Sequence, residues 1–559
     1  MAGDLCFLGE PLAVIPIVVN AGAALLPAMI AGVTTFLALL LKPRELIRAC
    51  RQRPAIAGGV LAGGLAVAAL IYWRPAGDSA TVGRRTRSGA DAGAAAGTGA
   101  GLGLTVDWTQ IALARLQARE SGAALASPAP MPATPAAAAE PFVFRGGLTR
   151  TGAIGRPPAP PLRQAWRVYP RFKNDAGVEQ VDTEAMILSS PAAHGDRIFG
   201  ASCFLDPPKS FGTIFCVEAA TGKQLWSVDR ADGEEFKGFF SSPAVTADGR
   251  FLVIGQGLHP DANCRLVCVD AGTGRVHWTV KVPLHVESSP FIDGDVVYVG
   301  CGAIEDPATH RPISHPGFVL AVRISDGREL WRCDVADPES SPAVRDGVLY
   351  IGSGFNGNAV VALRTGTDAE LQQRGEARLL WKTPTTHPIT GAITLVGDLV
   401  VAGGGNGDFV FRDPHPAGAV LALDRRTGRV RWQTDLPDAV LGAVAAGASL
   451  ICPVANGEVV ALKPEDGTRL WSVRISGNAP VLAAPALAGQ EIFAVSQDGY
   501  LARIGAERGE IRERHYLNAA DRPGAQGLSI SSPLVVNGRL YVGSETGGLI
   551  SFIGGPTTP

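Results

Sequence analysis

The sequence predicts an all-β fold, an eight-bladed β-propeller, from two recurring patterns and from the way the two ends of the repeat region complement each other. The first pattern is clearest from Val267 to Trp278, where an apolar strand ends in Asp, a polar turn carries Thr-Gly, and a second strand reaches Trp. Gly suits the left-handed backbone position that closes a short hairpin loop, and Asp can bond the amides of the turn. Variants of this hairpin end at Trp226, Trp331, Trp381, Trp432 and Trp471.

The second pattern is Ser-Ser-Pro followed by a turn and an apolar strand, and it lies upstream of each hairpin. It begins at Ser189, Ser241, Ser288, Ser340 and Ser531, with degenerate forms near Thr390, Gly442 and Ala483. The patterns together mark eight units of roughly 40 to 50 residues, a period typical of propellers and other repeat arrays. Each unit contains about four short runs separated by turn residues, which is the content of one blade.

The ends of the repeat region indicate how the ring closes. The last unit, from Ser531 to Ile553, stops before any Trp-bearing strand, whereas an orphan strand with Trp166 precedes the first complete unit. We expect this orphan strand to complete the eighth blade, because a closed ring leaves no open sheet edge. The seventh unit has Glu513 where Trp is expected, so its outer strand is predicted to be the weakest.

The recurring tryptophans are predicted to be structural. A large ring at the same place in each blade can wedge against the neighbouring blade and bury on the order of 200 Å² of side chain. Repetition at successive blades favours packing over a cofactor role. The residues assigned to this blade docking are Trp166, Trp226, Trp278, Trp331, Trp381, Trp432 and Trp471.

The Asp-x-x-Thr-Gly-x-x-x-Trp repeat, the Ser-Ser-Pro strand and the lead-in from Phe144 to Gly152 resemble the quinoprotein-type, PQQ-repeat β-propeller family over roughly residues 141 to 554. The resemblance implies two kinds of protein. One is the PQQ-dependent dehydrogenase, and the other is a non-enzymatic scaffold such as the lipoprotein of the outer-membrane β-barrel assembly machine. The enzymes typically carry two adjacent cysteines over the cofactor, with acidic and amide ligands to calcium. This sequence contains no Cys-Cys pair.

Residues 1–74 are predicted to be a membrane anchor with transmembrane helices at about 21–41 and 54–73, because both stretches lack charge and approach the ~20 residues that span a bilayer. The loop at 42–53 carries five basic residues and one acidic residue, so it is expected to face the cytoplasm. This orientation predicts an inner-membrane protein with its propeller on the periplasmic or extracellular side. A cleavable signal peptide is less favoured, since the first ten residues hold only the charges of Asp4 and Glu10.

Residues 75–140 are rich in Ala, Gly, Ser and Pro and are predicted to be a flexible linker to the propeller at 141–559. A short amphipathic helix is expected within this linker at 107–121. The formal net charge of the 559-residue chain is −2, so no basic excess points to nucleic acid as a partner.

Seven of the nine cysteines fall within the predicted propeller. Cys203 and Cys216 lie on neighbouring predicted strands and could be bridged, although spacing alone does not fix connectivity. Neither a haem-attachment motif nor the spacing of a cysteine-rich zinc site is present.

One group of ionisable residues stands out when the blades are aligned on Ser-Ser-Pro. The residue before this motif is predicted to lie near one mouth of the central channel, and it is apolar in most blades but acidic in the third and fourth. The predicted cluster comprises His285, Glu287, Asp337, Glu339 and His387. Such a set could hold calcium or another hard cation, or perform acid–base chemistry.

The favoured interpretation of this cluster is a solvated channel mouth that tolerates charge. No catalytic residue and no metal ligand is assigned, and PQQ and calcium stay open as cofactors. The other loop histidines, His259, His310, His315 and His415, are predicted to be surface residues.

The function favoured by the sequence is a non-catalytic, protein-binding scaffold of the cell envelope, with outer-membrane protein assembly as its setting. Envelope proteins are expected to bind extended loops on one face, including Leu205 to Phe211, Ile304 to His315 and Arg364 to Ala377. The alternative is a membrane-bound PQQ-dependent dehydrogenase. A sensor that signals through the membrane helices is a weaker third option, because the cytoplasmic loop carries no signalling domain.

Overall fold

The computed structural model describes residues 142–555, apart from 148–149, 174–177, 207–208, 305–312, 314–315, 410–411 and 525–526. The chain divides into two units, Met1–Pro135 and Ala136–Pro559, and the described residues belong to the second. The two predicted transmembrane helices and the predicted linker therefore lie outside the described residues. In the described part of the chain, no helix is long and apolar enough to cross a membrane.

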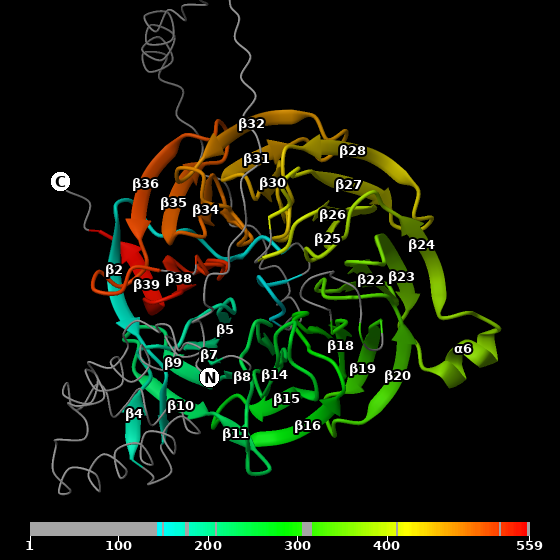
Figure 1. Cartoon of the computed structure of the whole chain (residues 1–559), viewed down its shortest axis with the longest axis horizontal. Helices are drawn as coiled ribbons and strands as arrows, with labels where there is room; N and C mark the ends of the chain where they lie inside the picture. The colour runs from blue at the N-terminus through cyan, green and yellow to red at the C-terminus, as the bar shows by residue number, and fades with distance from the viewer. Residues whose placement is uncertain are drawn as a thin grey trace, which may run out of the picture. The chain divides into compact units, whose positions relative to one another are not determined.

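Eight antiparallel sheets are arranged around a central channel, which confirms the predicted eight-bladed propeller (Figure 1). The first blade contains β5 (Ala192–His194), β6 (Arg197–Ala201), β9 (Ile214–Glu218) and β10 (Gln224–Val228). The second contains β13 (Ala244–Val245), β14 (Phe251–Gly255), β15 (Cys264–Asp270) and β16 (Val276–Val282). The third contains β17 (Phe291–Asp293), β18 (Val296–Cys301), β19 (Phe318–Arg323) and β20 (Glu329–Asp334). The next two are β21 (Ala343–Arg345), β22 (Val348–Ser353), β23 (Ala359–Arg364), β24 (Leu379–Pro384); and β25 (Thr394–Val396), β26 (Leu399–Gly405), β27 (Gly418–Asp424), β28 (Val430–Leu436).

The sixth and seventh blades are β29 (Ala445–Ala446), β30 (Leu450–Pro453), β31 (Glu458–Leu462), β32 (Arg469–Arg474); and β33 (Ala486–Ala488), β34 (Glu491–Val495), β35 (Tyr500–Gly505), β36 (Ile511–Tyr516). The eighth contains β37 (Leu534–Val536), β38 (Arg539–Ser544), β39 (Gly548–Gly554), β2 (Leu162–Val168) and, in parallel on β37, β1 (Ala153–Ile154). The remaining elements are β3 (Arg171–Lys173), β4 (Glu179–Val181), β7 (Phe204–Asp206), β8 (Lys209–Phe211), β11 (Arg230–Ala231), β12 (Glu234–Glu235) and α6 (Asp368–Arg374).

Ring closure follows the sequence expectation. Strand β2, which carries Trp166, pairs antiparallel with β39, so residues from the two ends of the propeller sequence share the eighth sheet. The two middle strands of a blade are almost completely buried, whereas the residues of the outer strand are mostly half-buried or exposed, as β15 and β16 illustrate. This pattern arises because neighbouring blades cover both faces of the middle strands, while the outer strand faces solvent on one side.

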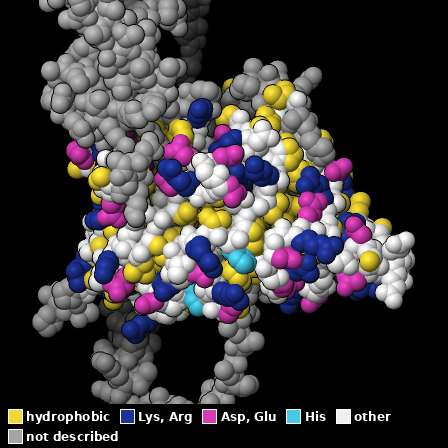
Figure 2. Space-filling model, turned by 90° about the horizontal axis from the view of Figure 1, so that it is seen from below, with side chains coloured by type: hydrophobic (Ala, Val, Ile, Leu, Met, Phe, Trp, Pro, Cys, Tyr) yellow, Lys and Arg dark blue, Asp and Glu magenta, His cyan; other side chains and the backbone are white. Residues whose placement is uncertain are grey.

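The antiparallel order of the strands gives the ring two distinct ends. The connection between the second and third strands of a blade, and the connection from one blade to the next, lie at one end, which we call the mouth end. The connections between the first and second strands and between the third and fourth strands lie at the other, which we call the turn end. Figure 2 shows charged side chains of both signs interspersed over one side of the described ring.

The serines of the Ser-Ser-Pro motif form hydrogen bonds between blades at the inner edge of the ring, and we call this set the serine belt. In four of the five motifs the first serine donates to the carbonyl at the equivalent position of the next blade, as Ser241 Oγ does to Ser288 O at 3.0 Å. Ser189 Oγ instead donates to Ala201 O of its own blade. The second serine accepts from the backbone N–H of its counterpart in the preceding blade. These bonds are Ser190 N to Ser242 Oγ, Ser242 N to Ser289 Oγ, Ser289 N to Ser341 Oγ and Ser532 N to Ser190 Oγ.

Tryptophan side chains make the corresponding contacts near the outer edge. The Nε1 of Trp226 donates to Ala271 O at 3.1 Å in the turn of the next blade. Gly274 of that turn has φ 74° and lies so close to the Trp226 ring that an added Cβ would be 2.5 Å from it. The other indole bonds of this kind are Trp166 to Ala219, Trp278 to Ile324, Trp331 to Thr365, Trp381 to Arg425, Trp432 to Pro464 and Trp471 to Ala506.

Glu513 makes a polar contact at the position where the seventh blade lacks Trp. Its Oε2 accepts from Leu162 N of the eighth blade at 2.7 Å, and its Oε1 accepts from Arg503 at 3.1 Å. The lower stability of this outer strand stays a prediction.

Replacing Trp331 with Ala is expected to lower the free energy of unfolding by about 3–5 kcal/mol, the usual cost of truncating a buried tryptophan. The Trp331 side chain is buried, and Arg378 lies over its ring at 4.1 Å. The control is Leu470→Ala, because Leu470 is 44% exposed and is expected to cost less than about 0.5 kcal/mol. Urea unfolding of both variants measures the difference, and equal costs would contradict docking by the tryptophan.

Candidate functional site

The N-terminal segment of the propeller crosses the central channel. Phe142 pairs with Val245 of the second blade, and Leu487 N of the seventh blade donates to Thr151 O at 2.7 Å. Between these contacts, two arginines with almost no exposed surface reach carbonyls of distant blades. Arg145 donates to Pro485 O, and Arg150 donates to Pro342 O.

Burial lowers the pKa of both guanidinium groups to about 9. Both therefore stay charged at neutral pH, and they bond carbonyls of the innermost strands. Through these contacts, the N-terminal segment of the propeller fills the channel on the turn side of the serine belt.

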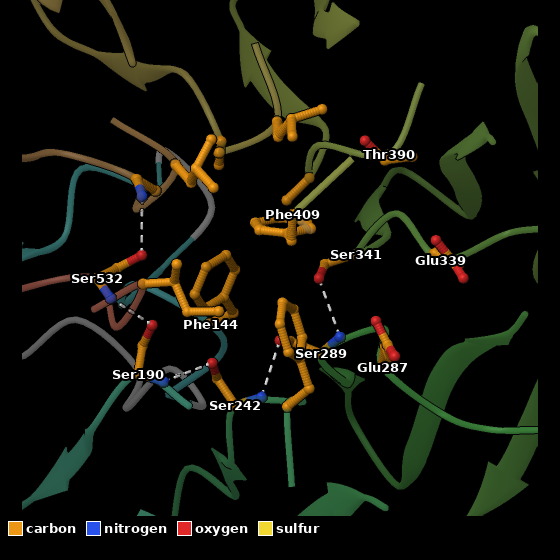
Figure 3. Close-up of a pocket in the computed structure, with 18 of the residues that line it drawn as sticks. Phe144, Ser190, Ser242, Glu287, Ser289, Glu339, Ser341, Thr390, Phe409 and Ser532 are labelled. Atoms are coloured by element: carbon orange, nitrogen blue, oxygen red, sulfur yellow. Dashed lines mark hydrogen bonds between the residues drawn. The ribbon is translucent and has the colours of Figure 1, made fainter. Parts of the chain in front are cut away.

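Aromatic side chains narrow the channel at the mouth end. Phe240 of the second blade and Phe409 of the fifth meet edge to face, with ring centroids 5.0 Å apart. A cavity of about 70 Å³ lies beside them and is lined by Phe144, Glu287 and Glu339 among others (Figure 3). The second serines of the serine belt border this cavity, so its wall is polar on the side of the eighth blade and blades one to four. Blades five to seven contribute Ala392, Ala443 and Ala484 at the corresponding positions, and these alanines pack with Phe144.

The two glutamates of the predicted cluster come together with two histidines. Glu287 and Glu339 precede the serine motifs of the third and fourth blades, and their side chains are 8% and 7% exposed. His259 Nε2 lies 2.9 Å from Glu339 Oε1 and 3.7 Å from Glu287 Oε2. His285 has no exposed surface, and its Nε2 lies 2.8 Å from Ala303 O. We call His259, His285, Glu287 and Glu339 the mouth cluster.

Desolvation dominates the electrostatics of the mouth cluster. Burial raises the pKa of Glu287, while the nearby His259 lowers it in part. Burial, followed by the repulsion of His259, lowers the pKa of His285 to about 3, so this ring is neutral at physiological pH. Because Ala303 O can only accept, His285 donates from Nε2 and carries an unprotonated lone pair on Nδ1.

The other two residues of the predicted cluster have different positions. Asp337 is buried behind the mouth cluster, where its Oδ1 accepts from Ala303 N at 3.0 Å. Ala303 is thereby held by Asp337 at its N–H and by His285 at its carbonyl. Among the described residues, no hydrogen bond or ion pair joins the side chain of His387 to the cluster, and its backbone carbonyl accepts from Thr385.

His259 is the residue that the sequence interpretation missed. It was predicted to be a surface histidine, yet its ring lies against both glutamates and 5.2 Å from the ring of His285. His259 follows β14, in the connection between the second and third strands of the second blade. The signal was therefore present in the strand order, because that connection lies at the same end of the ring as the residues before Ser-Ser-Pro. His310 and His315 fall outside the described residues, and His415 is exposed as expected.

The seven cysteines among the described residues are all free. The bridge considered between Cys203 and Cys216 is therefore absent. Cys216 lies opposite Phe199 in the first blade, whereas Cys203 forms an isolated backbone bridge with Met186. The two side chains consequently belong to different surroundings, although their strands are close in the sequence.

The channel does not fit PQQ. Its cavity of about 70 Å³ is well below the ~300–1,000 Å³ of small-molecule sites, because Phe144 and Phe409 occupy the space. The mouth cluster is also a poor calcium site, since calcium takes six to eight oxygen ligands. Two carboxylates and two imidazole rings form instead a mixed oxygen and nitrogen donor set.

Comparisons with known proteins agree with this architecture. A family model described as "Outer membrane protein assembly factor BamB" matches residues 210–303 and 416–553. The assembly factor BamB of Yersinia pestis is 23% identical over 65% of this chain and 83% of its own length. That of Burkholderia pseudomallei is 25% identical over 59% of this chain and 88% of its own length. This chain is a PQQ-repeat β-propeller similar to BamB.

Quinoprotein enzymes share the fold. The quinohemoprotein alcohol dehydrogenase ADH IIB of Pseudomonas putida is 23% identical, but the match covers only 37% of the enzyme. Among solved structures, BamB from Moraxella catarrhalis matches with a TM-score of 0.50 at 19% identity, covering 71% of this chain and 99% of that chain. The quinohemoprotein alcohol dehydrogenase of Comamonas testosteroni matches with a TM-score of 0.52 at 14% identity, covering 76% and 82%. These structural matches establish the propeller fold alone.

The raised pKa of Glu287 gives a pH-dependent prediction. Glu287 holds its proton more tightly in the folded protein than in the unfolded chain. The folded protein therefore loses stability as the pH rises through the folded-state pKa of this carboxyl group. Glu287→Gln removes the ionisation and keeps the shape. In the presence of a chelator, we expect this variant to have a higher melting temperature than the parent at pH 8, and the two to converge at acid pH.

The control for this measurement is Glu507→Gln, because Glu507 is exposed on the surface. Its difference from the parent is expected to be small and independent of pH. Melting curves from pH 4 to pH 8 test both variants. A Glu287→Gln difference that shrinks as the pH rises would contradict the assignment.

Proposed function

We propose that this chain is a non-catalytic, protein-binding scaffold that takes part in the assembly of outer-membrane proteins. The observation that carries the proposal is the closed channel, in which the N-terminal segment and the Phe240–Phe409 pair leave a cavity of only about 70 Å³. Binding is thereby directed to the outer surface of a rigid ring. The similarity to BamB proteins, whose name describes an outer membrane protein assembly factor, supports this role.

Exposed apolar side chains at the mouth end are candidate contacts for a protein partner. Ile313, between β18 and β19, is 67% exposed. Val178 and Val181, in the β3–β4 hairpin segment between β2 and β5, are 56% and 49% exposed. Charges of both signs are mixed over the ring side in Figure 2, so charge does not single out one area there. Apolar anchors surrounded by polar residues are typical of protein-binding surfaces.

The loops expected to bind partners on a single face lie at both ends of the ring. The described residues of the connections 205–211 and 304–315 lie between second and third strands and belong to the mouth end. The connection 364–377 joins the third strand, β23, to the fourth, β24, so it belongs to the turn end. It carries α6, which lies at the periphery of the ring in Figure 1. Successive connections alternate between ends in an antiparallel blade, which is why similar loop lengths do not imply one face.

The alternative, a PQQ-dependent dehydrogenase, rests on the shared fold. The channel of this chain lacks the space for such a cofactor, and the sequence lacks adjacent cysteines. The scaffold role is therefore the better supported of the two.

Site-specific photo-crosslinking in the native host tests the scaffold role. A photoreactive residue in place of Ile313 is expected to capture proteins of outer-membrane assembly. The matched control is Val430, which is 46% exposed and begins the outer strand of the fifth blade at the turn end. Capture that is equal from both positions, or that yields no envelope protein from position 313, would contradict the proposal.

The sequence further supports a proposal for location, namely the inner membrane with the propeller on its outer side. The two uncharged stretches at 21–41 and 54–73 and the basic loop between them carry this proposal.

Protease treatment of intact spheroplasts tests on which side of the inner membrane the propeller lies. We expect the full-length chain to sediment with inner membranes and the propeller to be digested, while a cytoplasmic marker protein stays intact. If the propeller were digested only after lysis, the orientation would be the opposite of the one proposed. Recovery of the full-length chain in the soluble fraction would refute the membrane anchor.

A further inference from the structure

We propose that His259, Glu287 and Glu339 bind one divalent transition-metal ion at the mouth of the channel, with His285 lying behind the two glutamates. No partner protein is needed to complete this site, because all four side chains come from this chain. The site lies outside the proposed protein-binding role and does not depend on it.

The geometry of the three donor groups suits a single ion. One side-chain donor atom from each of His259, Glu287 and Glu339 lies within 4.8 Å of the other two. A tetrahedral ion with ligands at about 2.0–2.1 Å holds its donor atoms about 3.3 Å apart. The distances from His259 Nε2 to Glu339, 2.9 Å, and to Glu287, 3.7 Å, lie on either side of this value. Small side-chain movements therefore suffice to form the site.

The charge of the surroundings favours a cation. Two carboxylates that are only 8% and 7% exposed lie against the imidazole ring of His259, so two negative groups are drawn close together in a nearly buried place. Asp261 and Asp408 add further negative charge close to Glu287. Lys237 is directed to other groups, because its Nζ lies 3.8 Å from Asp261 and donates to Ala262 O.

A second observation comes from His285. Its Nδ1 is buried and has no hydrogen-bond partner among the described residues. With Nε2 donating to Ala303 O, the lone pair of Nδ1 lies 3.8 Å from Glu287 Oε1, so two acceptors approach each other away from water. Such an arrangement is costly unless a proton or a cation lies nearby. A metal ion on the glutamates removes this cost.

The backbone around the cluster is fixed before any ion binds. The serine belt joins the third blade to the fourth directly after the two glutamates, through Ser288 and Ser289. Gly302 lies against His285 and Glu339, where an added Cβ would be 2.5 Å from His285 Cε1 and 2.8 Å from Glu339 Cγ. The space that a side chain would fill is thus left to the cluster.

The donor types select the class of metal. Imidazole suits zinc, copper, iron and nickel, whereas an all-oxygen set suits magnesium and calcium. One imidazole and two carboxylates are therefore expected to bind Zn²⁺ more tightly than Ca²⁺. Because the three ligands come from blades two, three and four, the ion would also tie these blades together at the mouth end.

Metal titration of the untagged full-length chain, after removal of metals with a chelator, tests the site. We expect one Zn²⁺ per chain and much weaker binding of Ca²⁺. His259→Ala and Glu339→Gln are each expected to weaken Zn²⁺ binding more than about 100-fold. His285→Asn is expected to weaken it by about 10–100-fold, the usual effect of removing a group that supports a ligand. Co²⁺ in place of Zn²⁺ should give visible absorption that His259→Ala abolishes.

The matched control is His415→Ala, because His415 is an exposed histidine in another connection at the mouth end. It is expected to leave Zn²⁺ affinity unchanged. Melting curves of the metal-free variants show whether each one is folded. Absence of stoichiometric Zn²⁺ binding in the parent, equal binding in folded His259→Ala or Glu339→Gln, or a preference for Ca²⁺ would each overturn the proposal.

Discussion

The serine belt is the constraint on which the rest of this structure depends. In the first four blades and in the eighth, the innermost strand is preceded by serine hydroxyl groups that bond the backbone of an adjacent blade, as Ser288 does to Ser340 O at 2.9 Å. Because the partner is a backbone atom, the bond fixes the position of the whole strand and not only of a side chain. Residues that directly precede the belt, including Glu287 and Glu339, are thereby held close together across two blades. The cavity at the channel axis has a defined wall for the same reason.

Contacts at a larger radius complement the belt. The tryptophan of one blade packs on the glycine of the next, and its indole nitrogen bonds a carbonyl of the same turn, as Trp226 does with Gly274 and Ala271. Glycine is required there because the φ of 74° and the close approach of the ring both exclude a side chain. Belt and docking contacts act at different distances from the axis, so together they fix both the position and the tilt of the blades that carry both.

The central channel of this propeller is filled by the N-terminal segment. Arg145 and Arg150 are charged groups with almost no exposed surface, and the carbonyls of distant blades are among their hydrogen-bond partners. A segment held by such contacts is not readily displaced, because removing the carbonyls would leave a buried charge without its partners. The channel is consequently part of the protein core, and the functional surfaces are its mouth and the loops around it.

The sequence by itself determined the repeat, the number of blades and the closure by the strand of Trp166, because strand periodicity and turn residues are local signals. It also brought Glu287 and Glu339 to one place, since both occupy the same position in consecutive repeats. Only the tertiary structure decided that His259 joins them and that no contact links His387 to them among the described residues. It alone revealed that Phe144 and Arg145 fill the channel. Those residues lie in connections and in the lead-in segment, whose course is set by contacts between distant parts of the chain and not by the repeat.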